Sequence, residues 1–290
     1  MVSLQRWHPV AALCYFAAVI GLTMTLSNPL CQAVSLVSGM AAYGMLAGPR
    51  RLAGTLLFTL PMVLLAALVN PLFSQAGLTV LFYLNDSPVT LEALLSGLSA
   101  AAMLAGVLYW FACFSEVMTS DKLIFLFGRF APAIALTISM ALRLVPHFRR
   151  QAAVIRNAQK TLGGDVGSGS WLSRARGGVR MTSILVTWAL ENGVDTADSM
   201  RARGYSLRRK TSYSAFRFRL SDGLVLAGTA LLLILAAALT RRMSYLPVYT
   251  GLNWCWREIV GCGAHLLLCA APLIFGGMEV LWWRFSLSRI

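Results

Sequence analysis

The sequence is organised around the stretch VDTADSMRARGY, residues 194–205. Asp198 and Arg201 are three residues apart, a spacing that brings opposite charges together on one face of a helix. Gly204 follows Arg203 at the position where a residue in the left-handed conformation commonly ends a helix. The stretch therefore predicts the C-terminal end of a helix, with both arginines near the unpaired carbonyl groups that favour cations.

Two interpretations of this helix end stay open on the stretch alone. A solvated, well-capped end needs no partner, and charged runs are usually solvated surfaces. Alternatively, the helix holds Arg203 outward on a stiff stalk, where its guanidinium can enter a groove on another protein that carries a carboxylate. The rest of the chain has to distinguish these interpretations.

The composition is that of a membrane protein with one long polar insert. Hydrophobic residues make up 58% of the 290 residues, charged residues make up 12%, and the mean hydropathy is +0.68. Soluble domains carry about twice this share of charge. The net charge is +14, and residues 143–219 contain 15 of the 25 Lys and Arg but only four acids. A basic block between apolar segments predicts a cytoplasmic location by the positive-inside rule.

The basic insert also limits the classes of partner. It suits anionic lipid headgroups or an acidic protein surface, and the cluster from Arg143 to Arg150 fits either a lipid-binding patch or a docking surface. No nucleic-acid partner is expected, because no zinc-finger, homeodomain or RNA-binding signature accompanies the charge. No cleavable signal peptide is expected, because the first apolar run lacks a clear cleavage site. The six cysteines have no paired spacing and are expected to be small buried hydrophobic residues: 14, 31, 113, 255, 262 and 269.

Six apolar segments are predicted to cross the membrane, and six crossings leave both termini inside. They are residues 10–26, 31–47, 52–69, 91–114, 224–239 and 261–283. Arg50 and Arg51 mark an inner turn, and the absence of Lys and Arg from 52 to 121 fits an outer loop within that range. Arg241 and Arg242, predicted to lie outside, depart mildly from the charge rule.

The insert is predicted to be helical. If segment 123–144 crossed the membrane, the basic block would lie outside, so we expect this segment to lie along the cytoplasmic floor of the bundle. A basic helix from Arg143 to about Leu162 and a second from Trp171 to Arg203 follow, joined by a glycine-rich linker. The second helix has one predicted buried face, at the helical spacing of Met181, Ile184, Leu185 and Trp188.

The predicted fold is thus an all-α membrane protein of about six transmembrane helices and a cytoplasmic coupling domain of long crossed amphipathic helices. Its predicted parts are residues 1–120, 121–220 and 221–290.

Candidate catalytic and metal sites each have a simpler explanation. The linker lacks the Gly-Lys-Ser/Thr of a phosphate loop. Cys262, His265 and Cys269 share a helical face but have no fourth ligand, so ordinary packing is favoured over a metal site. Glu116 and Asp121 fit a proton relay or, as we expect, a water-facing helix end. Because no set of residues has catalytic spacing, the chain is not expected to be an enzyme.

The sequence resembles the transmembrane T component of energy-coupling factor (ECF) transporters, the shared scaffold of a class of ABC importers for vitamins and metal ions. The hallmark of this family is an Ala-Arg-Gly that ends a cytoplasmic helix, and Ala202-Arg203-Gly204 is similar to its second copy. Further matches follow in the family's order: Asn28-Pro29, Asn70-Pro71-Leu72-Phe73 with Gly77, Leu142-Arg143-Leu144-Val145-Pro146, and Ala158-Gln159.

The position of the first Ala-Arg-Gly departs from the family. Lys160-Thr161-Leu162-Gly163 stands there, with Leu162 at the arginine position. The resemblance implies that Ala202, Arg203 and Gly204 dock one ATPase and that the first docking end lies around Lys160 to Gly163. There, either Lys160 supplies the charge or the contact is more apolar than usual. Secondary candidates are Arg176 (in an Ala-Arg-Gly near the start of the second helix), Arg201 and Asp198.

The resemblance also implies a division of labour in the cell membrane of a prokaryote. Two ABC ATPase subunits hold ATP and Mg and bind the two cytoplasmic helix ends, while a small membrane S component carries the substrate. The chain itself binds no cofactor. Two other classes compete: a stand-alone membrane carrier whose basic insert binds lipid or a regulator, and an integral membrane enzyme. The predicted spans contain almost no charged residues, which disfavours the carrier. The absence of a set of residues with catalytic spacing disfavours the enzyme.

Overall fold

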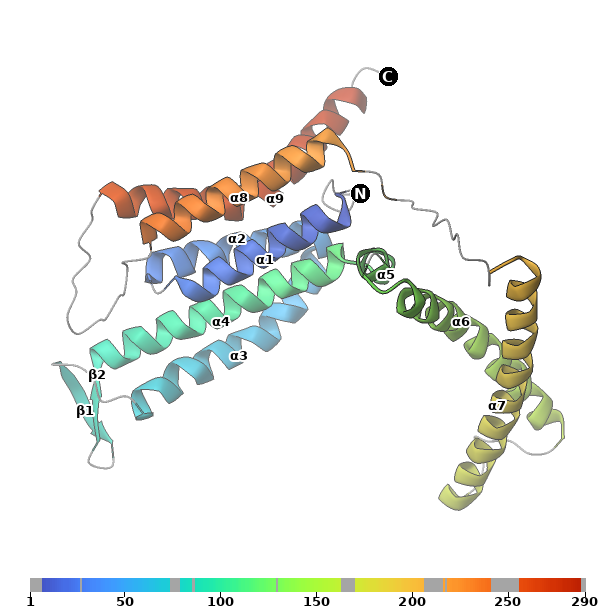
Figure 1. Cartoon of the computed structure of the whole chain (residues 1–290). Coiled ribbons are helices and arrows are strands. Elements are labelled where there is room, and N and C mark those ends of the chain that lie inside the picture. Colours follow the sequence, from blue (N-terminus) through green and yellow to red (C-terminus); the bar gives the residue numbers. More distant parts are fainter. Residues whose placement is uncertain are drawn as a thin grey trace. The chain divides into compact units, whose positions relative to one another are not determined.

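The computed structural model describes residues 7–26, 28–73, 79–84, 87–128, 130–162, 170–205, 216, 218–240 and 256–287. These residues form nine helices and one short antiparallel hairpin (Figure 1). The helices are α1 (Pro9–Thr25), α2 (Pro29–Ala47), α3 (Pro49–Phe73), α4 (Leu91–Val117), α5 (Ser120–Gly128), α6 (Pro132–Thr161), α7 (Trp171–Ala202), α8 (Leu220–Thr240) and α9 (Trp256–Leu287). The hairpin strands are β1 (Val80–Leu84) and β2 (Ser87–Thr90). Apart from this hairpin, the prediction of a helical fold is confirmed.

The chain folds into two compact units. One contains residues 1–123 together with 216–290, and the other contains residues 124–215. The first unit holds the apolar helices α1 to α4, α8 and α9, so both ends of the chain contribute to it. The second unit holds α6 and α7, while α5 begins in the first unit and ends in the second.

Four helices of the first unit are long and apolar enough to span a membrane. These segments are Pro29–Ala47, Pro49–Val69, Leu91–Val117 and Leu220–Leu239. Two shorter apolar helical segments, Pro9–Thr25 and Ile259–Ile274, lie in α1 and α9. They fall short of the roughly 20 residues that a perpendicular helix needs to cross a bilayer. All six predicted spans therefore lie on helices, and four of these helices meet the length and composition of a span within the described residues.

The helix boundaries in the first unit follow from local sequence. At the start of α2, the Asn28 side chain accepts a hydrogen bond of 3.0 Å from the Leu30 backbone N–H, and Pro29 occupies the first helical position. Both are preferred choices at a helix start. Gly48, with φ of +88°, ends α2, and Pro49 begins α3 at once. Proline and glycine thus set a tight turn between two apolar helices.

Small and polar side chains hold α1, α2 and α4 together inside the first unit. A Cβ on Gly39 of α2 would lie 3.3 Å from Trp110 Nε1 of α4, so glycine at this position allows the close contact between the two helices. Trp110 Nε1 donates a 3.0 Å hydrogen bond to Ser35 Oγ, which also lies 2.9 Å from Thr23 Oγ1. Ser35 therefore ties three helices together at a site where water does not compete for the bonds.

The prediction that the cysteines are unpaired, buried hydrophobic residues is wrong for Cys14, which is exposed, and for the two cysteines that pair. Cys31 of α2 and Cys262 of α9 form a disulfide, with their Cα atoms 6.0 Å apart. They are 231 residues apart in the chain, so local spacing carries no signal of the pairing. Cys14, Cys113 and Cys269 are free, and position 255 lies outside the described residues.

The predicted helix boundaries between residues 123 and 162 are also wrong. α5 ends at Gly128, and α6 runs without interruption from Pro132 to Thr161. Pro132 lies in the first turn of α6, where the missing N–H has no helical acceptor to lose. Pro146 lies inside α6 on an exposed stretch, where water can reach the carbonyl group that proline leaves without a donor.

Candidate docking ends of the coupling helices

The second unit is a crossed pair of long helices (Figure 1). α7 covers Trp171–Ala202, which confirms the helix predicted from Trp171 to Arg203. Near the crossing, the rings of Phe148 on α6 and Trp188 on α7 meet edge to face, with centroids 5.8 Å apart. This is a favourable aromatic geometry and fixes the contact between the two helices.

The predicted apolar face of α7 is only partly covered. Met181, Leu185 and Trp188 are half-buried, whereas Ile184 is exposed, and no described residue of α7 is fully buried. The prediction of a single buried face is therefore wrong at Ile184. The physical reason is that a single crossing helix covers only a short length of its neighbour.

The end of α7 has a complete hydrogen-bonded cap. Gly204 has φ of +78°, its N–H donates to the Arg201 carbonyl at 3.0 Å, and the Tyr205 N–H donates to the Met200 carbonyl at 3.0 Å. This pair of bonds, with glycine in the left-handed conformation, is a Schellman motif. The sequence prediction of Gly204 as the helix stop is confirmed. The predicted docking residues do not include Tyr205, although its backbone N–H makes the second hydrogen bond of the cap, to the Met200 carbonyl.

The cap places the charged residues of the predicted site on an exposed tip. Ala202 and Arg203 are both exposed, and Arg203 makes no salt bridge within the described part of the chain. The predicted pairing of Arg201 and Asp198 is present, with 3.8 Å between Nη1 and Oδ1. Because both side chains are largely exposed, this pair contributes little stability. The tip thus keeps an accessible guanidinium on a helix end of fixed backbone geometry.

The end of α6 differs from the end of α7. Leu162 follows the last helical residue with φ of −85°, and its side chain is 79% exposed. Thr161 Oγ1 donates to the Ala158 carbonyl at 2.8 Å, and Lys160 is exposed. Gly163 lies outside the described residues. This end therefore presents one large apolar side chain and one cation, with no arginine at the tip.

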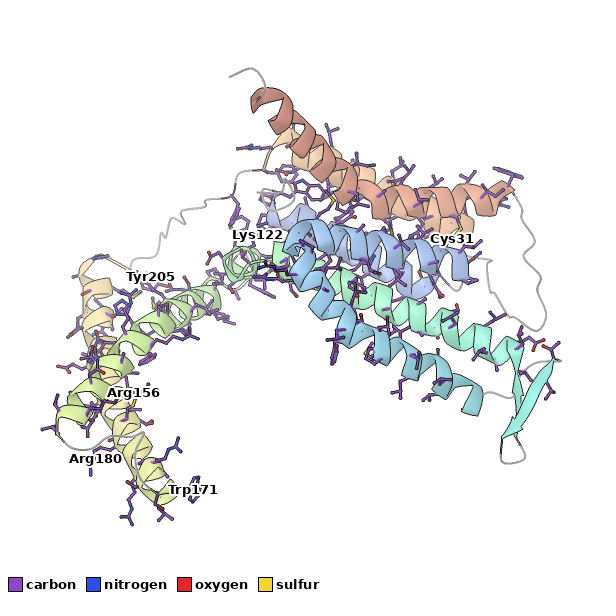
Figure 2. The ribbon with its side chains drawn as sticks, turned by 180° about the vertical axis from the view of Figure 1, so that it is seen from behind. Cys31, Lys122, Arg156, Trp171, Arg180 and Tyr205 are labelled. Atoms are coloured by element: carbon purple, nitrogen blue, oxygen red, sulfur yellow. A yellow bond between two sulfur atoms is a disulfide. The ribbon has the colours of Figure 1, made fainter. Side chains whose placement is uncertain are left out.

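Arg176 lies far from the capped tip. It is exposed in the second turn of α7, whereas Arg203 follows the last turn. Figure 2 shows Trp171 and Tyr205 at opposite ends of this helix. At 1.5 Å per residue, Arg176 and Arg203 are separated by roughly 40 Å along the axis. The two arginines cannot belong to one docking end.

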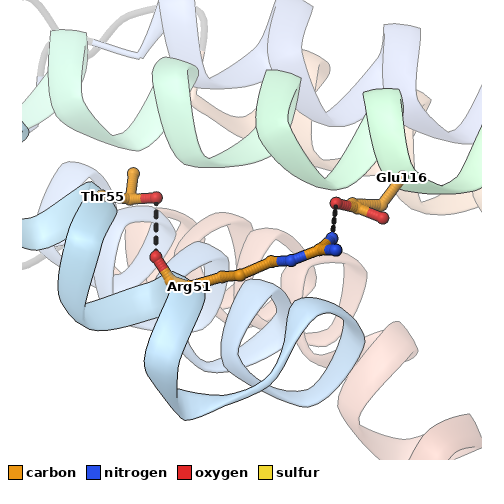
Figure 3. Close-up of polar contacts among 3 residues, drawn as sticks. All are labelled: Arg51, Thr55 and Glu116. Carbon is orange, nitrogen blue, oxygen red and sulfur yellow. Dashed lines mark hydrogen bonds and ion pairs between the residues drawn. The ribbon is translucent and has the colours of Figure 1, made fainter.

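The other candidate sites of the sequence resolve as packing and a surface ion pair. Cys262 is in the disulfide, and His265 is buried with Nε2 3.6 Å from Cys269 Sγ. The described residues contain no cluster of three or more metal-ligating side chains. Glu116 Oε1 lies 2.9 Å from Arg51 Nη1 (Figure 3), and both side chains are partly exposed, as expected for a water-facing helix end.

Six apolar helices joined to an exposed pair of long, polar helices define a multi-pass membrane protein with a helical platform. The chain belongs to the CbiQ family, described as cobalt transport protein, which matches residues 2–213. The match contains α1 to α7 and ends before α8. It confirms the predicted family resemblance.

Two of three similar curated proteins carry the name of the predicted component. A Lactobacillus helveticus protein named energy-coupling factor transporter transmembrane protein EcfT is 38% identical over 72 residues, which are 25% of this chain and 26% of that protein. A Listeria innocua protein of the same name is 31% identical over 100 residues, 34% of this chain and 38% of that protein. A Mycoplasma pneumoniae protein, described as uncharacterised, is 31% identical over 107 residues, 37% of this chain and 25% of its own length. In each case, the chain matches less than two fifths of the relative.

Proposed function

We propose that this chain is the membrane scaffold, or T component, of an ECF-type ABC importer. In this role it couples ATP binding and hydrolysis by two partner ATPases to substrate release by a small membrane S component, in uptake of a vitamin or metal ion. The chain performs no chemistry itself, and ATP and Mg are bound by the ATPases. The family match and the name of two relatives support the class of transporter.

The observation that carries the proposal is the capped, exposed tip of α7. A groove of an ATPase that holds a carboxylate would receive Arg203, while Ala202 and Gly204 are small enough to let the backbone approach closely. A guanidinium–carboxylate pair is directional and often bidentate, so it would fix the register of docking as well as the affinity. Arg201 and Asp198 lie within about one and a half turns of Arg203 and would contribute at the rim.

The second ATPase would dock at the end of α6, through Lys160, Thr161, Leu162 and Gly163. Leu162 would insert as an apolar anchor, and Lys160 would supply the charge. Because α6 and α7 cross and share the Phe148–Trp188 contact, displacement of one helix end would be passed to the other helix. Closure of the ATPase pair would thus move the platform as a unit, and the membrane helices would pass that motion to the S component.

The docking role is tested by Arg203→Glu. Removal of one partner from a buried charge pair typically costs about 2–5 kcal/mol, a loss of roughly 30-fold or more in affinity at room temperature. We expect the variant to reach the membrane at normal levels and to lose the ATPases during purification in mild detergent. Arg180→Glu is the matched control, because it makes the same charge change at an exposed position on the same helix. Normal recovery of the ATPases with Arg203→Glu would refute the docking role.

The α6 end is tested by Leu162→Arg, which restores the residue that the family resemblance implies there. The side chain is exposed, so the fold should accept the longer cation. We expect assembly and transport to be retained. Loss of the ATPases in this variant would mean that this end docks by a different geometry.

A further inference from the structure

We infer that Cys31 and Cys262 form an extracytoplasmic oxidation site, whose disulfide fastens the C-terminal helices α8 and α9 to the part of the chain that matches the family. Cys31 belongs to α2, inside the matched residues 2–213, and Cys262 belongs to α9, outside them. The bond therefore joins the part of the chain that matches the family to a part that lies outside the match.

Both cysteines lie near the same, outer ends of their helices. Cys31 is the third residue of α2, and the opposite end of that helix leads to Arg50 and Arg51. The positive-inside rule places those arginines in the cytoplasm, about 24 Å along the axis from Cys31. Cys262 is the seventh residue of α9, about 9 Å from its start. Exposed Trp256 and Arg257 open α9, as an interfacial anchor would.

The helices around the pair form a small apolar cluster of their own. It contains Leu22 of α1, Leu26 directly after α1, Cys31 of α2, Ala236 of α8 and Ala264 of α9. Four helices thus meet at the disulfide. Cys31 is 2% exposed and Cys262 is half-buried, so once formed the bond is shielded from soluble reductants.

The oxidation needs an external disulfide donor, such as a membrane-associated thiol oxidase. One cysteine thiolate attacks a sulfur of the donor disulfide and forms a mixed disulfide, releasing one donor thiolate. The second cysteine then attacks the mixed disulfide, which forms the Cys31–Cys262 bond and releases the other donor thiol. Two thiols of the chain are oxidised, and the donor leaves as a dithiol that holds both protons and both electrons. Such donors act on the outer side of the membrane, whereas cytoplasmic thiols stay reduced.

The bond limits how α9 can move relative to α2. It holds the outer ends of the two helices together, while the opposite ends carry no such link among the described residues. Loss of a disulfide that closes so long a loop destabilises a protein substantially. We expect the double variant Cys31→Ser with Cys262→Ser to unfold in detergent at a midpoint at least about 5 °C lower.

The test counts free thiols in the full chain. Cells are quenched with acid, which stops thiol–disulfide exchange, and the protein is denatured and treated with a maleimide of large mass, with or without prior reduction. Of the six cysteines, we expect two to react with the maleimide only after reduction. Cys31→Ser should give the same number of tagged thiols with and without reduction. The matched control Cys14→Ser, at a free and exposed position, should lose one tagged thiol in both conditions and keep two that react only after reduction.

Six free thiols in the wild-type chain before reduction would overturn the proposal, whether or not any variant folds. The location of the oxidation is tested in a host that lacks its extracytoplasmic thiol oxidase. There we expect the number of thiols that react only after reduction to fall from two towards zero. A number that stays at two in this host would contradict external oxidation.

Discussion

The substitution Gly204→Ala tests the cap on which the accessible arginine depends. Gly204 has φ of +78°, and its N–H bonds the Arg201 carbonyl at 3.0 Å. A side chain with a Cβ pays roughly 1–2 kcal/mol in the left-handed conformation, because its Cβ crowds the following carbonyl oxygen. We expect this cost to fall on the last turn of α7, where it would lower protection of the Arg203 and Tyr205 amides from hydrogen exchange by about 5- to 30-fold.

Two further variants separate the cap from a general effect of removing glycine. Gly204→Asn should retain most of the protection, because asparagine tolerates the left-handed region. Gly193→Ala lies inside the same helix, where an added Cβ would meet no atom within 4 Å, and φ there is not in the left-handed region. This control should stabilise α7 by up to about 1 kcal/mol, since alanine is the better helix former. Unchanged protection in Gly204→Ala, or an equal loss of protection in the Ala and Asn variants, would show that the left-handed conformation at Gly204 does not hold the end of α7.

Two predictions concern charges of the first unit. Arg51→Met should lower the free energy of unfolding by no more than about 1 kcal/mol, because the 2.9 Å pair of Arg51 with Glu116 (Figure 3) is partly exposed to solvent. A double-mutant cycle with Glu116→Gln measures the coupling energy of the pair. A coupling energy above about 2 kcal/mol would contradict the prediction. Lys122 is 4% exposed, and its Nζ has no hydrogen-bond partner in the described residues. Burial lowers the pKa of Lys122 from its ordinary value of 10.5. Folding therefore disfavours the protonated form, and the stability of the wild-type chain should rise as the pH rises towards 10.5. Lys122→Met should raise stability at pH 7 by about 1 kcal/mol and flatten this pH dependence, as measured by thermal unfolding in detergent. Lys160→Met, at an exposed position, is the control, and a loss of stability in Lys122→Met alone would show that the ammonium has a partner.

The membrane helices and the tip of α7 were predictable because their signals are local. Apolar runs of span length, Asn28-Pro29 and Gly48-Pro49 set helix starts and stops within a few residues of chain. The stop at Gly204 likewise needs only the order of residues around it. The exposed arginine followed from the same short stretch.

Features that depend on tertiary packing were not predictable. The Cys31–Cys262 disulfide joins residues 231 positions apart, and only the arrangement of α2 beside α9 brings them together. The continuity of α6 through Pro146 depends on solvent access to the helix, which a propensity argument does not include. The exposure of Ile184 depends on how little of α7 its neighbour covers. In each case, the deciding interaction lies outside the local window.

The proposed function requires that the tip of α7 contact a nucleotide-hydrolysing partner. A photo-crosslinking amino acid at position 205, introduced in cells that produce the chain's native partners and activated in membranes, tests this contact directly. We predict a crosslinked product that contains an ABC ATPase, identified by mass spectrometry, and no such product with the crosslinker at the exposed position 186 of the same helix. Crosslinks from position 205 to lipid alone, with no ATPase, would contradict docking of an ATPase at this tip.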